Sequence, residues 1–133
     1  MLSFPKVQDL KFRPALFYPA IIFFIVTTIL LVIPGDELPK TDINFFDKFV
    51  HVGLFCVLTS LFLWPFKLSL LSPPQRRSWF LSIMLYAIAY GIIMEFVQKY
   101  FVPNRSYDEI DMLADGFGSL AAYVIGVILW AKK

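Results

Sequence analysis

Four long apolar runs, each of the length needed to cross a lipid bilayer, constrain this chain more than any other feature. They occupy residues 15–33, 49–66, 79–98 and 112–131. The first contains no charged residue, and as a helix it would extend about 28 Å, close to a hydrocarbon core of roughly 30 Å. It is too long for a signal-peptide core, so we expect it to be retained. We therefore expect an all-α integral membrane protein, a compact bundle of four transmembrane helices.

The composition supports this class of protein. The 133 residues are 59% hydrophobic and 18% aromatic, and the mean hydropathy is +0.71, whereas soluble domains have an apolar share of roughly half. The chain is predicted to form a single domain. A net charge of +2 is too small to indicate a nucleic-acid partner. Cys56 is the lone cysteine, so neither a disulfide framework nor a cysteine-based zinc motif is expected.

The charges between the apolar runs predict an orientation. Basic residues dominate the N-terminal arm, the second connection and the C-terminus: Lys6, Lys11, Arg13, Lys67, Arg76, Arg77, Lys132 and Lys133. Acidic residues dominate the first and third connections: Asp36, Glu37, Asp42, Asp108 and Glu109. Because basic segments stay in the cytoplasm, we expect both termini inside and both acidic connections outside.

Two polar residues open the second run with helical spacing. Asp47 and His51 are four residues apart, with Lys48 between them, so both share one face of a helix. A carboxylate beside an imidazole fixes its tautomer and raises its basicity, as a general base or metal ligand requires. The alternative is that Asp47 caps the helix and His51 makes a local hydrogen bond.

A second polar pair ends the third run. Glu95 and Gln98 are three residues apart and therefore also share a face. A glutamate there could extend toward the membrane surface. Because its side chain is short and lies a full turn inside the run, we expect it to face inward and to have a partner.

The fourth run begins with a series of carboxylates. Arg105 precedes Asp108, Asp111 and Asp115, which are spaced three and four residues apart. Asp108 is a candidate N-cap, and Asp111 could share that role. Asp115 lies too far inside the run to do so. On a neighbouring face, small residues recur every fourth position and predict close helix contact: Ala114, Gly118, Ala122 and Gly126.

These pieces predict one shared pocket in the outward-facing half of the protein. Its expected members come from three runs: His51, Glu95, Gln98, Arg105, Asp111 and Asp115. Burying them separately would leave several unpaired polar groups in lipid. We expect Arg105 to lie beside at least one carboxylate as its countercharge. Residues 38–46, which mix Ile43 and Phe46 with polar residues, are expected to lie in the membrane interface.

From Asp47 to Gly126 the chain resembles the VanZ-like family of small bacterial membrane proteins. The resemblance is carried by Asp-Lys-x-x-His at the start of the second run, Glu-x-x-Gln at the end of the third, and Arg105 followed by Asp111, Asp115 and Gly118. The family more usually has Asn at the position of Asp115 and often Gly at that of Ala122. The resemblance implies the bacterial cytoplasmic (inner) membrane and an accessory role in envelope stress or tolerance of glycopeptide antibiotics.

Two functions fit these residues. The preferred one is a site that binds a cell-envelope component, such as a lipid-linked wall precursor or a glycopeptide. Its ligand-binding residues would be Lys48, Gln98, Arg105, Asp108 and Asp115. The alternative is an outer-leaflet hydrolase or transferase, with chemistry performed by four side chains: Asp47, His51, Glu95 and Asp111.

Other activities have weaker signatures. A proton- or ion-coupled carrier is disfavoured because the inner halves of the runs lack acidic residues and so offer no relay. A metal site is conceivable, but one histidine among scattered acids is a weak signature, so we assign no metal ligands. The sequence does not identify a cofactor, and the expected partner is the lipid bilayer.

Overall fold

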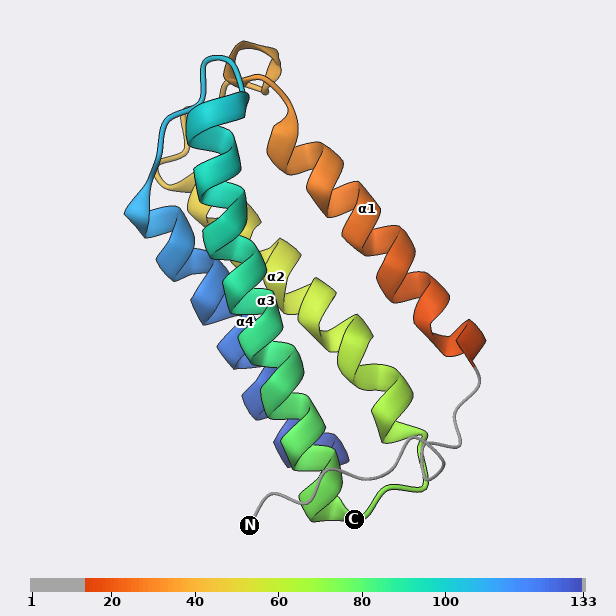
Figure 1. Cartoon of the computed structure of the whole chain (residues 1–133). Helices are drawn as coiled ribbons and strands as arrows, with labels where there is room; N and C mark the ends of the chain where they lie inside the picture. The colour runs from red at the N-terminus through yellow and green to blue at the C-terminus, as the bar shows by residue number, and fades with distance from the viewer. Residues whose placement is uncertain (1–13, 133) are drawn as a thin grey trace.

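The structure is a computed structural model that describes residues 14–132, and all regular secondary structure there is helical. Its elements in chain order are η2 (Pro14–Phe17), α1 (Tyr18–Val32), η3 (Gly35–Glu37), α2 (Phe46–Lys67), α3 (Pro73–Phe101) and α4 (Glu109–Trp130). The four long helices run lengthwise beside one another (Figure 1). Each is long and apolar enough to cross a membrane when η2 is counted with α1.

The number and type of the predicted elements are therefore confirmed. Insertion into a membrane and the side that each end faces stay predictions. Of the charges used to predict orientation, Lys6, Lys11, Arg13 and Lys133 lie outside the described residues.

The third helix is longer than the apolar run that predicted it. It starts at Pro73 and ends at Phe101, whereas the run covers residues 79–98. Proline is well tolerated in the first turn of a helix because its missing N–H has no intrahelical partner there. Ser72 and Gln75 form a capping box at this start. The two prolines thus begin the helix, and polar residues beyond the apolar run extend it.

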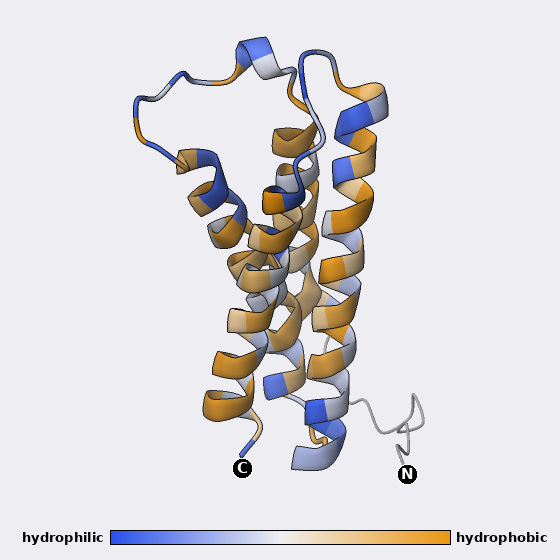
Figure 2. Ribbon diagram, turned by 90° about the vertical axis from the view of Figure 1, so that its left-hand side faces the viewer, coloured by the Kyte–Doolittle hydropathy of each residue, from blue (hydrophilic) through white to orange (hydrophobic). Residues whose placement is uncertain are grey.

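Two connections lie together at one end of the bundle, which we call the polar end (Figure 1). They are residues 33–45 and 102–108, and the Gly35 N–H donates a hydrogen bond to the carbonyl of Pro103, with an N–O distance of 3.1 Å. Figure 2 shows hydrophilic residues on the helices near this end and also at the opposite end, with apolar residues over the middle of the bundle. The expected interfacial segment, residues 38–46, lies at the polar end mostly without regular secondary structure; its depth in a membrane stays a prediction.

The stripe of small residues brings α4 against α2. All four of its residues are buried: Ala114, Gly118, Ala122 and Gly126. A Cβ atom added at Gly118 would overlap the carbonyl oxygen of Val52 on α2. Since no real Cβ contact is that close, only glycine fits there, and the predicted close helix contact is confirmed.

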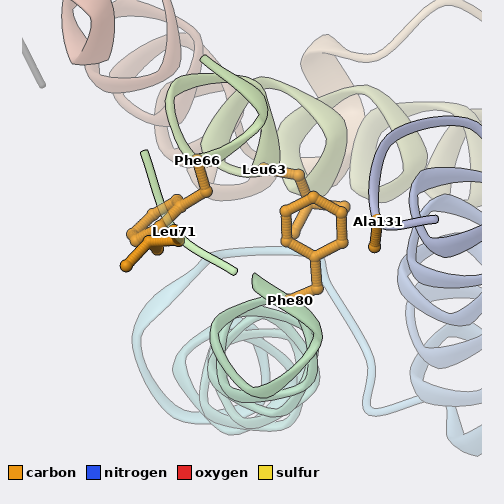
Figure 3. Packing of buried hydrophobic residues seen from close by; sticks show 5 residues of the cluster. All are labelled: Leu63, Phe66, Leu71, Phe80 and Ala131. Carbon is orange, nitrogen blue, oxygen red and sulfur yellow. The ribbon is translucent and has the colours of Figure 1, made fainter. Parts of the chain in front are cut away.

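The opposite end of the bundle, which we call the apolar end, is held by packed hydrocarbon. Its buried core comprises Leu63, Phe66, Leu71, Phe80 and Ala131. Figure 3 shows the Phe80 ring between Leu63 and Ala131. Partly buried aromatic residues surround this core, and the rings of Phe66 and Trp79 stack with centroids 5.1 Å apart. Helix α1 is the least buried of the four helices.

Candidate functional site

Ionisable side chains from α2, α3 and the start of α4 meet at the polar end. This polar cluster consists of Lys48, His51, Glu95, Asp108, Asp111 and Asp115. Four of its members are almost fully buried: only 1% of Glu95, 1% of Asp115, 4% of His51 and 7% of Asp111 is exposed. The predicted convergence of these four residues is therefore observed.

His51 lies between two carboxylates of α4. Its Nδ1 is 2.7 Å from Oδ1 of Asp115, and its Nε2 is 3.8 Å from Oδ2 of Asp111. The sequence suggested Asp47 as the carboxylate partner of His51, and this is wrong. Asp47 lies one turn nearer the helix start, its side chain is 61% exposed, and it pairs with the adjacent Lys48. The small residues of α4 allow Asp115 to approach α2 instead.

Lys48 provides the countercharge of the cluster. Its ammonium group forms hydrogen-bonded ion pairs with Asp47, Asp108 and Asp111, the last with an N–O distance of 2.6 Å. Asp108 also caps α4, because its Oδ1 accepts a hydrogen bond from the Ile110 N–H, with an N–O distance of 2.8 Å. This confirms the capping role that was an alternative for Asp108. The hydrogen bond from Lys48 holds the pKa of the Asp108 carboxyl below its ordinary value.

Glu95 points inward and has a partner, as predicted. One of its carboxylate oxygens, Oε2, accepts a hydrogen bond from the backbone N–H of Asp108, with an N–O distance of 3.1 Å. Glu95 also lies with His51 and Asp111, so that one donor atom from each is within 4.8 Å of the others. Three helices thus contribute one potential acid, base or metal ligand apiece.

The structure places the side chains of Gln98 and Arg105 against the end of α1 and not among the carboxylates. The Gln98 amide donates to the carbonyl of Leu31, with an N–O distance of 2.8 Å. Arg105 donates through Nε to Ile33 and through Nη2 to Leu30. Both side chains therefore satisfy carbonyl groups at the end of α1 that no further helical turn can satisfy.

The expected pairing of Arg105 with a carboxylate is wrong. Among the described residues Arg105 forms no ion pair, and Lys48 occupies the position expected for it. The spacing of charges along the chain does not predict which cation pairs with the carboxylates, because Lys48 at the start of α2 and Arg105 after α3 both lie at the polar end. The catalytic and ligand-binding roles assigned to the individual residues stay predictions.

A cavity of about 450 Å³ opens beside the polar cluster. Its walls come from α1, the connection between α1 and α2, and the first turns of α2. Apolar residues form much of its lining: Leu30, Leu31, Leu38, Ile43, Val50 and Leu54. Asp47, His51 and Arg105 also line it. The contribution of α1 and of the connection was not foreseen, because neither carries a polar motif.

Comparison with known proteins gives one informative similarity. Over 95 residues, or 71% of this chain, the sequence is 32% identical to an uncharacterized protein of the fission yeast Schizosaccharomyces pombe. The matched region is 55% of that protein's length, so the chain spans about half of its relative. No protein-family model matches the chain, and no solved structure matches it. The resemblance to the VanZ-like family and the bacterial location therefore stay predictions.

Proposed function

We propose that this chain is a membrane protein that binds an amphiphilic, lipid-like molecule in the cavity beside α1. The observation that carries the proposal is the lining of that cavity. It combines leucine side chains with the polar groups of Asp47, His51 and Arg105. Ligand sites typically pair a mostly apolar wall with a few polar groups that fix orientation.

The polar groups favour a headgroup that carries negative charge. Arg105 uses Nε and Nη2 to bind α1, while its Nη1 makes no hydrogen bond to a described residue. A guanidinium group binds phosphate or carboxylate oxygens well. Asp47 has an exposed carboxylate, which would accept a hydrogen bond from a hydroxyl or ammonium group of the ligand. The apolar chain of the ligand would then contact Leu31 and Leu54.

We also propose that the chain is VanZ-like, because the motifs that carry this resemblance include most of the polar cluster. In a bacterial host the ligand would be an envelope lipid or a glycopeptide at the outer face of the inner membrane, with an accessory role in envelope stress. The similar yeast protein comes from a eukaryote. The proposed ligand class is therefore defined by amphiphilic chemistry and not by a bacterial wall.

Bound lipid tests the proposal. The wild-type chain, purified in mild detergent, should retain about one lipid per chain in native mass spectrometry. Leu54→Trp should lower that retention at least about tenfold by filling the cavity. Leu120→Trp adds the same ring at an exposed position of α4 and should leave retention unchanged. Equal retention by the two variants would contradict the proposal.

A second candidate function is hydrolysis or transfer at the headgroup. It is favoured by the contact between Asp115 and Nδ1 of His51, which orients the ring and leaves Nε2 to accept a proton. Incubation with extracted membrane lipids should then release a headgroup product detected by mass spectrometry. His51→Gln should slow release by roughly 10²-fold or more. Lipid binding without turnover would exclude this candidate and leave the binding proposal intact.

A further inference from the structure

We propose that His51, Glu95 and Asp111 form a binding site for one divalent transition-metal ion. This inference goes beyond the proposed lipid site and does not depend on it. The three residues come from α2, α3 and α4, and all three are buried. Metal sites in helix bundles are commonly built this way, from side chains of facing helices that project inward.

The donor atoms are close enough to share an ion. One donor from each residue lies within 4.8 Å of the other two, and Nε2 of His51 is 3.8 Å from Oδ2 of Asp111. Two ligands that each lie about 2.1 Å from an ion can be up to roughly 4.2 Å apart. Donors around one tetrahedral ion are closer still, about 3.4 Å apart, so the side chains would move together by up to roughly 1.4 Å on binding the ion.

Each of the three residues also makes a hydrogen bond to a partner outside the set. Nδ1 of His51 is 2.7 Å from Asp115, and Oδ1 of Asp111 accepts a hydrogen bond from Lys48. Oε2 of Glu95 accepts a hydrogen bond from the backbone of Asp108. A metal-ligating histidine almost always has such a carboxylate or carbonyl on its other nitrogen, and ligating carboxylates are similarly held. The outer contacts therefore match those that hold the ligands of a metal site in place.

The charge balance at the polar end favours a cation at this position. The three buried carboxyl groups, those of Glu95, Asp111 and Asp115, lie around one lysine and one histidine. Buried charges of one sign are costly unless they are paired or bind a metal.

A second group of carboxylates is a poor rival for the ion. Asp47, Asp108 and Asp111 also lie close together, but the ammonium group of Lys48 is bonded to all three. It occupies the place that a metal ion would take.

The donor set indicates the class of metal. One imidazole and two carboxylates, without a thiolate, suit Zn²⁺, Mn²⁺ or Fe²⁺. Three protein ligands leave at least one position for water or for an oxygen of a bound molecule. Because His51 also lines the cavity, such a ligand could reach the ion from there.

Metal content after reconstitution tests the site. The full chain, stripped with chelator and then dialysed against Zn²⁺ or Mn²⁺, should retain about one ion per chain by mass spectrometry of the element. Glu95→Gln should retain less than about a tenth of that amount, whereas the exposed Glu109→Gln on α4 should retain the full amount. A metal-free wild type, or equal retention by the two variants, would overturn the proposal. Loss of the ion in Asp47→Asn but not in Glu95→Gln would also overturn the proposal. It would show that the ion binds the second group of carboxylates instead.

A spectroscopic measurement keeps the test valid if Glu95→Gln does not fold. The chain has one histidine, so wild-type protein labelled with ¹⁵N-histidine and loaded with Mn²⁺ has a single imidazole that can bind the ion. Pulsed electron paramagnetic resonance should detect ¹⁵N coupling from that ring. Bound Mn²⁺ without ¹⁵N coupling would overturn the site. Neither readout depends on lipid, so failure of the metal site is distinguishable from failure of the lipid proposal.

Discussion

The two ends of the bundle are stabilised by different interactions. At the polar end, α2, α3 and α4 are joined by hydrogen bonds and ion pairs centred on Lys48 and His51. At the apolar end, Phe80 and its neighbours form an apolar core, beside which the buried Arg76 donates hydrogen bonds to the carbonyl groups of Leu71 and Trp130. Packing tolerates small changes in shape, while a buried charge must keep its particular partners. The paired charges therefore fix which faces of α2, α3 and α4 meet at the polar end, and the candidate site lies there too.

The largest expected effect comes from removing the central cation. Lys48→Met leaves the carboxylates of Asp108 and Asp111 without their ammonium partner, and breaking a buried ion pair typically costs about 3–5 kcal/mol. Unfolding in detergent, followed by circular dichroism, would measure the loss. Lys40→Met removes an exposed lysine and should change the free energy of unfolding by less than about 0.5 kcal/mol. Equal small losses in both variants would show that the polar end does not depend on its charges.

Adding a methyl group to glycines of α4 tests how closely the helices pack at each end of the bundle. Gly118→Ala places a Cβ against the backbone of Val52 at the polar half, where nothing can yield, and should cost about 1–3 kcal/mol. Gly126→Ala meets the flexible end of Leu63 at the apolar end and should cost less than about 1 kcal/mol. Gly116→Ala is the control, since its Cβ would meet nothing within 4 Å. Thermal unfolding of all three variants checks the order, and a reversal of Gly118 and Gly126 would refute it.

The attachment of α1 to the polar end should be weaker than the cluster itself. Gln98→Leu removes the hydrogen bond to the carbonyl of Leu31, and an unsatisfied buried carbonyl costs about 1–3 kcal/mol. Hydrogen exchange should rise in the last turns of α1 and stay unchanged in α4. Uniform exchange across all four helices would mean that Gln98 stabilises the whole fold rather than this helix.

The smallest effect is a dependence of stability on acid pH. The pKa of Asp108 is lowered in the folded chain by Lys48, so its contribution is present above the ordinary pKa of 3.8 and is lost as the pH falls through the lowered value. The difference in unfolding free energy between wild type and Asp108→Asn should therefore be constant between pH 5 and 7, as a rough window, and shrink below about pH 4. A difference that grows on acidification would contradict the assignment.

The periodicity of the sequence predicted more of the fold than of the contacts within the site. Apolar length predicted four helices, and shared faces brought His51, Glu95 and Asp115 together. Spacing along one helix cannot give the rotation of that helix against another, which is why Asp47 was chosen as the partner of His51. Nor can it show that Arg105 reaches back to the carbonyl groups at the end of α1. The contact between His51 and Asp115 depends on how closely Gly118 lets α4 approach α2.

A double-mutant cycle between His51 and Asp115 tests the convergence of the helices most directly. The cycle uses His51→Gln and Asp115→Asn, with the free energy of unfolding measured in detergent for each single variant and for the pair. Because the two side chains are 2.7 Å apart, we expect a coupling energy above about 1 kcal/mol. The matched cycle between His51 and Asp47, the pair that shares a helix face, should be additive within about 0.5 kcal/mol. Additivity for Asp115 together with coupling for Asp47 would contradict the structure of the site.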